Sequence, residues 1–234
     1  MSGPPVASAD KWATIKGAES IEGWLTSFEG ELLYDLARKD AAEGVILEIG
    51  SWKGKSTVLL AAGSKAGKGG SVYAVDHHKG SAEHLKSLGD VHTETEFRRN
   101  LERAGISKVV VPLVMSSRDA ALAWNRRPLP IRLLWIDGAH DYHSVLNDID
   151  LWSRFLIAQG IIAFHDFTHS QGVRRAVRQR IFCSNSFAEM KIHGSILYAR
   201  KRLKATPAQV LRNALAYVRL AWIEPRVRKL VGYH

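Results

Sequence analysis

The chain has 234 residues, of which 46% are hydrophobic and 24% are charged. This is an ordinary globular composition with enough length for one continuous core, so it excludes a disordered chain and a coiled coil. The single cysteine, Cys183, excludes an internal disulfide and a cysteine-based zinc cluster. Because the sequence has neither a long apolar run nor a basic, apolar leader, we expect a cytoplasmic protein without a transmembrane segment.

The net charge of +10 is concentrated at one end of the chain. Residues 200–234 contain nine lysine or arginine residues and one acid, so this tail carries +8 and the preceding residues carry only +2. A protein that reads nucleic acid usually spreads its basic residues over the face that follows the phosphates. We therefore expect no nucleic-acid partner.

Short apolar segments rich in β-branched residues alternate with helical patterns. Five of these segments predict buried strands: 45–49, 71–75, 109–114, 131–136 and 160–164. Strand and helix in alternation predict an α/β fold, a doubly wound and mainly parallel sheet with helices on both faces. Two further segments, 187–190 and 195–199, predict edge strands, the last antiparallel, which gives a seven-stranded Rossmann-like sheet.

The same pattern divides the chain into three parts. We expect an N-terminal helical cap in residues 1–40, an α/β domain in residues 41–202 and a basic amphipathic helix in residues 203–234. The apolar stripe of the last helix needs a cover, and a homodimer provides it. Attachment to an anionic membrane surface and guidance of a polyanionic substrate are the alternatives. Within the α/β domain, Thr93 and Glu96 predict a capping box at a helix start.

A glycine turn, in LEIGSWKGKST, joins the first predicted strand to the following helix. A P-loop requires four residues between its first glycine and the Gly-Lys-Ser that follows. Only three residues separate Gly50 from Gly54, and Ile49 stands where the first glycine should be, so a P-loop is excluded. A G-x-G-x-x-G dinucleotide motif is also excluded, because Trp52 and Lys55 occupy positions where it requires glycine. The remaining pattern, E-x-G-x-x-x-G, resembles the first motif of class I S-adenosylmethionine-dependent methyltransferases.

This resemblance implies a cofactor site for S-adenosylmethionine at the ends of the first three strands. Its residues would be Glu48, Gly50, Ser51, Gly54, Ser56, Asp76, Ser117 and Arg118. Glu48 and the glycine turn would hold the methionine part, and Asp76 would accept hydrogen bonds from the ribose hydroxyls. Ser117 and Arg118 would border the adenine. The alternative is that the glycines only permit tight strand-to-helix packing and that Asp76 caps a turn.

Polar residues follow the fourth and fifth predicted strands, namely Asp137, His140, His165 and Asp166. Because the carboxyl ends of neighbouring parallel strands meet at one edge of a sheet, we expect these side chains to converge. Converging carboxylates and imidazoles need a cation or a proton network between them, and a divalent metal ion is the simplest solution. His140 follows Asp137 by three residues, and an imidazole of pKa about 6.5 suits a general base.

The sequence as a whole resembles bacterial metal-dependent O-methyltransferases that act on macrolide sugars and cephalosporin precursors. The segments that carry this resemblance are LEIGSWKGKST, VYAVD, LLWIDGAHDYHSVLNDIDLW and GIIAFHDF. This resemblance, over roughly residues 40–170, implies metal positions at Asp137, His165 and Asp166 and a base at His140. Better-known members have a carboxylate where this chain has His165. His165 would therefore bind a softer ion such as Mn²⁺, hold a metal-bound water or orient Asp166, and we expect Mg²⁺ first.

These features predict an S-adenosylmethionine-dependent O-methyltransferase that methylates a hydroxyl group of a sugar or polysaccharide. Its acceptor would be a small molecule or an oligosaccharide, with a divalent cation assisting and His140 as the base. A catechol-like or phenolic metabolite is the alternative acceptor. A non-enzymatic nucleic-acid-binding protein that uses the basic tail is the alternative from another class.

Overall fold

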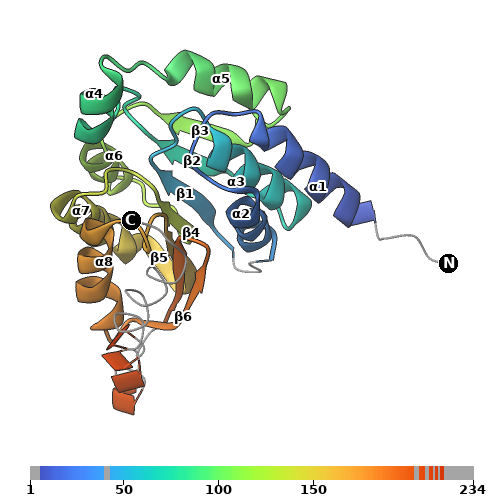
Figure 1. Cartoon of the computed structure of the whole chain (residues 1–234). Coiled ribbons are helices and arrows are strands. Elements are labelled where there is room, and N and C mark those ends of the chain that lie inside the picture. The colour runs from blue at the N-terminus through green and yellow to red at the C-terminus, as the bar shows by residue number, and fades with distance from the viewer. Residues whose placement is uncertain are drawn as a thin grey trace, which may run out of the picture.

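The computed structural model describes residues 6–39 and 43–202 and, beyond these, residues 206–208, 211–212, 214–215 and 217–218. Within the described residues, one seven-stranded sheet has the order β3-β2-β1-β4-β5-β7-β6 (Figure 1). Its strands are β1 (Val45–Ile49), β2 (Val72–Val75), β3 (Val110–Leu113), β4 (Ile131–Ile136), β5 (Leu156–Phe164), β6 (Phe187–His193) and β7 (Ile196–Lys201). Strands β1 to β5 pair in parallel, whereas β7 is antiparallel to both β5 and β6. The predicted fold class is confirmed.

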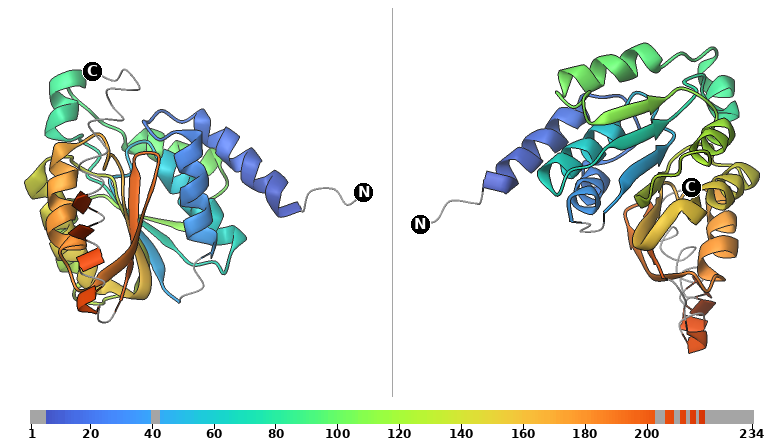
Figure 2. Two further views of the ribbon diagram at one scale, coloured as in Figure 1. Left: turned by 60° about the horizontal axis from the view of Figure 1, so that its bottom comes forward. Right: turned by 180° about the vertical axis from the view of Figure 1, so that it is seen from behind.

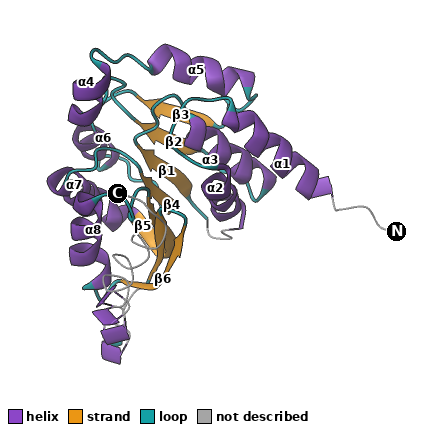
Figure 3. Ribbon diagram, in the orientation of Figure 1, coloured by secondary structure: helices purple, strands orange, loops and turns teal. Residues whose placement is uncertain are grey.

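Helices cover both faces of this sheet (Figure 3). The described helices are α1 (Val6–Glu19), α2 (Ser27–Lys39), α3 (Lys55–Ala66), α4 (Ala82–Leu88), α5 (Glu94–Arg103), α6 (Ser117–Trp124), α7 (Tyr142–Trp152) and α8 (Gln171–Val177). Helices α1, α2, α3 and α5 share one apolar core with one face of the sheet, and α6, α7 and α8 share a second core on the opposite face. The N-terminal helices are thus part of a packed layer, although the start of α1 extends beyond the sheet (Figure 2).

Helices α2 and α3 pack very closely at Gly63. A Cβ atom at Gly63 would lie 2.3 Å from the carbonyl oxygen of Tyr34, so only glycine fits between the two backbones. Leu33 on α2 and Leu60 on α3 are completely buried in the same core. This contact fixes α2 against the helix that follows the glycine turn, and it therefore fixes the start of α2 relative to the carboxyl edge of the sheet.

Three sequence predictions differ from the structure in detail. β5 begins at Leu156, because α7 ends at Trp152 and a short 3₁₀ helix, Ser153–Phe155, turns the chain into the strand. β7 lies between β5 and β6, so only β6 is an edge strand on that side. The predicted capping box is wrong, because the Thr93 side chain makes no cap hydrogen bond and its Oγ1 lies 2.9 Å from Nδ1 of His78 instead.

The strand register brings four strand ends to one level. Ile49, the last residue of β1, pairs with Val75 of β2 and with Ile136 of β4. Ile136 in turn pairs with Phe164 of β5. The residues that follow these strands therefore leave the sheet side by side, and they include the glycine turn and the predicted polar cluster.

Most of the predicted C-terminal helix, residues 203–234, lies outside the described residues. Those described between 207 and 218 are helical, and the ring of Tyr217 packs against that of Phe182 with centroids 5.2 Å apart. Leu211, Leu215 and Val218 are each more than half exposed. None of the helices in the described residues is long and apolar enough to cross a membrane.

Candidate active site

Two glycines shape the turn between β1 and α3. Gly50 has φ +82°, and a Cβ atom there would lie 2.2 Å from the carbonyl oxygen of Asp137. Gly54 has φ +91° at the cap of α3, and its Cβ would lie 3.1 Å from the Phe97 ring. Both positions favour glycine because side chains are strained in this left-handed region. The turn thus lies directly against the end of β4.

Asp76, at the end of β2, holds the glycine turn. Its Oδ2 accepts hydrogen bonds from the backbone N–H groups of Ser51 and Trp52, both at 2.9 Å. Its Oδ1 accepts one from the N–H of His78 at 2.7 Å. A carboxylate oxygen has two lone pairs, so Oδ1 retains one for a ligand. The side chain therefore secures the turn, and its role toward a ribose stays a prediction.

Glu48 lies beneath the turn and is fully buried. It accepts hydrogen bonds from the hydroxyls of Ser56 and Thr57, both at 2.5 Å. Burial, together with the nearby charges of Asp137 and Asp76, raises the pKa of Glu48 to about 8 against the effect of the two hydroxyls. The carboxyl group thus ties β1 to the first turn of α3.

Two cavities open at the carboxyl edge, and residues of the glycine turn line both. They have volumes of about 290 Å³ and about 310 Å³. The first is lined by Trp24, Lys55, Asp137, His140, His165 and Asp166, among others. The second is lined by Asp76, Ser117, Arg118 and Asp148, among others. Both are bordered by Gly50, Trp52, Asp137 and Gly138, so the two cavities meet beside the end of β4.

The eight predicted cofactor residues are divided between these cavities. Asp76, Ser117 and Arg118 line the second cavity, Ser51 and Ser56 line the first, and Gly50 borders both. Glu48 and Gly54 line neither. Ser51 is 2% exposed, and its Oγ has no hydrogen-bond partner among the described residues. Since buried hydroxyls are normally paired, this orphaned atom suits a polar group of a bound cofactor.

Ser117 is held in a buried polar chain at the second cavity. Its hydroxyl donates to Oδ1 of Asp148 at 2.5 Å and accepts from Nε1 of Trp152 at 2.9 Å. Burial raises the pKa of Asp148 to about 6, although the hydrogen bond from Ser117 opposes the shift. Sequence reasoning missed Asp148. The sequence feature that could have pointed to Asp148 is the place of this acid between Val145 and Trp152, on the apolar face of the predicted helix.

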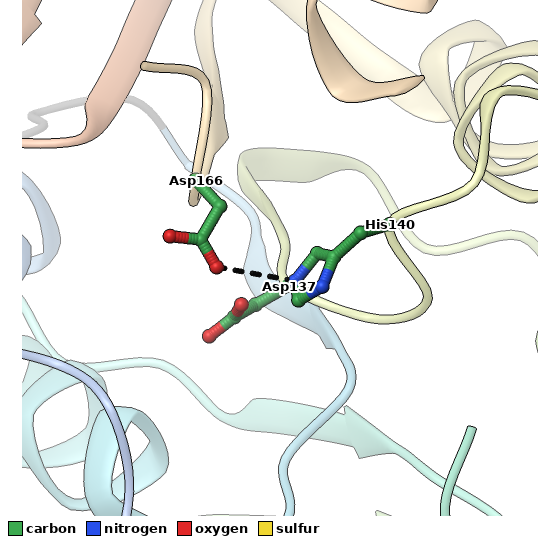
Figure 4. Close-up of side chains that lie close together, drawn as sticks. All are labelled: Asp137, His140 and Asp166. Atoms are coloured by element: carbon green, nitrogen blue, oxygen red, sulfur yellow. Dashed lines mark ion pairs between the residues drawn. The ribbon is translucent and has the colours of Figure 1, made fainter. Parts of the chain in front are cut away.

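Asp137, His140 and Asp166 come together in the first cavity (Figure 4). One ligand atom from each lies within 4.8 Å of the others, and Nε2 of His140 is 3.2 Å from Oδ2 of Asp166. Asp137 and Asp166 follow β4 and β5, whereas His140 reaches in from the loop before α7. The two carboxylates supply oxygen ligands of the kind that a divalent cation prefers, and the His140 imidazole lies beside them.

His165, the third predicted metal position, lies beside this group with 5% of its side chain exposed. Its Nδ1 is 3.1 Å from Oδ1 of Asp137 and 3.4 Å from Oδ2 of Asp166. Burial lowers the pKa of His165, but the charge of Asp137 and hydrogen bonds with Asp137, Asp166 and Glu29 outweigh burial and raise it. The ring therefore lies between the two carboxylates, and its role as a metal position stays a prediction.

Two residues outside the predicted motifs also reach the first cavity or its polar cluster. Trp24, from the segment between α1 and α2, is 62% exposed at the cavity, and its ring lies 5.6 Å from that of Trp52. Glu29, on α2, places Oε2 3.8 Å from Nε2 of His165. Neither contact has a local sequence signal, because the partners are far apart along the chain.

Known structures share this fold. The O-methyltransferase from Bacillus cereus in complex with SAH has a TM-score of 0.59 and 18% identity, covering 86% of this chain and 93% of its own. The O-methyltransferase NovP has a TM-score of 0.66 and 17% identity, covering 84% of this chain and 99% of its own. CalS11, a TDP-rhamnose 3′-O-methyltransferase of calicheamicin biosynthesis, has a TM-score of 0.53 and 14% identity, covering 86% and 96%.

The sequence itself matches the family described as "Methyltransferase domain" over residues 47–167, which is more than half of the chain. The match begins within β1 and ends just after Asp166. It therefore spans the glycine turn, the shared border of the two cavities and the polar cluster that follows β4 and β5. On this match, the chain belongs to the Methyltransferase domain family.

Proposed function

We propose that this protein is an S-adenosylmethionine-dependent O-methyltransferase that methylates a hydroxyl group of a sugar or polysaccharide with the help of a divalent cation. The observation that carries the proposal is the convergence of Asp137, His140 and Asp166 within 4.8 Å, in a cavity that shares Asp137 and part of the glycine turn with a second cavity. The second cavity would hold the nucleoside part of the cofactor, and the first would hold the acceptor and receive the methionine part beside Ser51.

The second cavity suits the nucleoside part of S-adenosylmethionine. Asp76 would accept a hydrogen bond from the ribose at its remaining Oδ1 lone pair, and Ser117 with Arg118 would border the adenine. The unpartnered hydroxyl of Ser51 would contact the methionine part. When bound, the cofactor supplies an electrophilic methyl group on a sulfonium. The shared border of the two cavities is where that methyl group would meet the acceptor.

The polar cluster suits activation of the acceptor hydroxyl. Asp137 and Asp166 would hold the cation, proposed as Mg²⁺, which lowers the pKa of a bound oxygen and orients it. His140 would accept the hydroxyl proton at Nε2, and Asp166, 3.2 Å away, would stabilise the imidazolium that forms. The acceptor oxygen would then bond to the methyl carbon as the carbon–sulfur bond breaks, and a neutral thioether would leave.

A ring-shaped acceptor fits the mouth of the first cavity. Trp24 and Trp52 place two indole rings there with centroids 5.6 Å apart. The apolar C–H face of a sugar packs well on an indole, while Lys55 and Glu22 in the same wall offer polar contacts to hydroxyl groups. The fold shared with CalS11, whose name states a sugar nucleotide substrate, agrees with a saccharide acceptor.

A methyl-transfer assay tests the proposal. Sugar and oligosaccharide acceptors and simple catechols are incubated with S-adenosylmethionine, with and without EDTA. We expect product from a saccharide, reversible loss of activity on chelation, and at least a 10²-fold loss in Asp137→Asn and Asp166→Asn, in the range of cation and base contributions. Asp150→Asn, a surface carboxylate paired with Arg180, is the matched control and should remain active. Turnover of catechols alone, or full activity without metal, would contradict the proposal.

We also propose that the protein is a homodimer. The exposed apolar side chains of Leu211, Leu215 and Val218 support this, because each is more than half exposed beside a Tyr217 ring that packs on Phe182. Burial of these side chains against a second copy would remove apolar surface from water, which stabilises the dimer by about 25 cal/mol for each Å² buried. Light scattering of the full-length chain tests the stoichiometry directly.

A further inference from the structure

The glycine turn contains two lysines whose side chains reach the segment between α1 and α2. Residues 20–26 connect these helices, and four consecutive ones line the first cavity, namely Glu22, Gly23, Trp24 and Leu25. We propose that Lys53 is a positioning residue for the acceptor, which ties this segment to the glycine turn and so keeps Trp24 beside Trp52 at the first cavity. This inference rests on the proposed function, in which the first cavity takes the acceptor.

Lys53 joins three parts of the chain through one ammonium group. Its Nζ is 2.7 Å from Oε2 of Glu22 in the connecting segment and 2.7 Å from Oε2 of Glu96 on α5. Hydrogen bonds with these two carboxylates raise the pKa of Lys53, which therefore remains a cation. Glu22 is 63% exposed, but only 18% of the Lys53 side chain is, so solvent weakens this charge-assisted hydrogen bond less than that of a fully exposed pair.

The backbone around Lys53 is fixed on the side of the glycine turn. The carbonyl oxygen of Lys53 accepts a hydrogen bond from Nδ2 of Asn100 on α5 at 2.9 Å. The N–H groups of Ser51 and Trp52 donate to Asp76 at 2.9 Å each. By contrast, residues 22–25 belong to no helix or strand. The glycine turn is therefore the rigid partner, and the connecting segment is the part that the ion pair holds in place.

The second lysine of the turn, Lys55, holds the same segment at the next residue. Its Nζ donates to the carbonyl oxygen of Gly23 at 3.2 Å. Trp24 follows directly, and its ring centroid lies 5.6 Å from that of Trp52 with an interplanar angle of 51°. Because Trp24 is 62% exposed, packing into the core does not fix its place. Its position therefore depends on the contacts that its neighbours make with the glycine turn.

Lys53 lines neither cavity, so its replacement leaves the cavity walls chemically unchanged. A change in acceptor binding in Lys53→Met must therefore act through the residues that Lys53 holds. A hydrogen bond to a charged group contributes more than an exposed ion pair, so we expect the acceptor KM to rise about three- to tenfold. Since Asp76 and the polar cluster are untouched, kcat and the S-adenosylmethionine affinity should stay within about twofold of wild type.

Near-ultraviolet circular dichroism reports the indole pair without any ligand. The signal of the pair is the spectrum of the wild type minus that of Trp24→Phe. We expect Lys53→Met to lose most of this difference signal, whereas Lys53→Arg, which keeps the charge, should retain both the signal and the wild-type KM. The kinetics use the saccharide that gives the most product in the methyl-transfer assay.

Glu96→Gln is the control for general effects of the lysine. It removes the other ion pair of Lys53 and leaves the contact with Glu22, so it should keep the wild-type KM. Glu22→Gln should reproduce the rise in KM even if Lys53→Met folds poorly. Combining Glu22→Gln with Lys53→Met should raise KM no further than either change alone, because both remove the same interaction.

The outcomes separate this inference from the proposed function. If the wild type methylates no saccharide, the proposed function is wrong, and the inference falls with it. If it methylates a saccharide, and Lys53→Met or Glu22→Gln keeps the wild-type KM or difference spectrum, only the role of Lys53 is refuted. An equal rise in KM in Glu96→Gln, or an equal loss of cofactor affinity in Lys53→Met, would also refute it. The effect would then come from docking of α5 or from the glycine turn itself.

Discussion

His140 combines two properties that a base beside a metal ion needs. It lines the first cavity, and its Nε2 lies 3.2 Å from a carboxylate that stabilises a positive ring. We expect His140→Ala to lower turnover by about 10²-fold or more, the range of general-base contributions. Affinity for S-adenosylmethionine should stay near wild type, because the second cavity is unchanged. His143→Ala, an exposed neighbour, is the control, and normal turnover in His140→Ala would remove His140 from the mechanism.

The buried carboxyl of Glu48 makes stability depend on pH. Its pKa is raised from 4.5 to about 8, so the folded chain keeps a proton that the unfolded chain releases between these values. The free energy of unfolding should therefore fall as pH rises from about 4.5 to about 8, by a few kcal/mol at most, and then level off. Glu48→Gln should remove this fall. Urea titrations of both proteins at pH 5 and pH 8 check it, and parallel pH profiles would contradict it.

Among elements, the junction of β1 with β4 depends on Gly50. Alanine there would have an unfavourable positive φ and a Cβ 2.2 Å from the Asp137 carbonyl. Since backbone atoms cannot move as cheaply as flexible side chains, we expect Gly50→Ala to lower the free energy of unfolding by about 3 kcal/mol or more and to weaken cofactor binding. Gly17→Ala, on α1 with nothing within 4 Å, should instead be neutral or stabilising by up to about 1 kcal/mol. Thermal unfolding with cofactor titration distinguishes the two.

Sequence patterns predicted those elements whose buried residues form a local signal. β1 and β4 were predicted with correct bounds, because almost every residue in them is buried. The start of β5 was missed, since its first half includes exposed residues and carries no continuous apolar run. β7 lies inside the sheet because it pairs with β5. Local sequence patterns do not indicate which strands pair, so this position was not predicted.

In the candidate site, too, features with a local sequence signal were predicted, and features that depend on contacts between distant parts of the chain were not. Asp137 and Asp166 were predicted to converge because strand ends in a parallel sheet meet at one edge. His165 was placed near them, but the Glu29 carboxylate 3.8 Å from its Nε2 was not predicted, because it comes from α2 and is held by the Ser195 N–H, 166 residues further along the chain. The role of Asp76 in holding the glycine turn depends similarly on two backbone N–H groups from another loop.

At the scale of the whole molecule, the excess positive charge lies in a different part of the chain from the residues of the candidate site. The residues that line the two cavities all lie before residue 167, whereas the +8 tail begins at residue 200. We expect a chain that ends at Arg202 to bind S-adenosylmethionine as the full chain does, and to be monomeric by light scattering. Neither form should bind duplex DNA at physiological salt. Loss of cofactor binding in a folded truncation, or tight DNA binding by the full chain, would contradict this.

The close contact between Glu29 and Gly194, in the turn between β6 and β7, also limits where residues can be inserted into the chain. Turns between adjacent antiparallel strands are usually good sites for grafting tags or extra loops, because few buried groups depend on them. Here an inserted residue would withdraw the Ser195 N–H from the acid that it supports. An epitope placed between residues 193 and 195 should therefore lower the free energy of unfolding, while the same epitope beside Gly89, whose surroundings are open, should change it little.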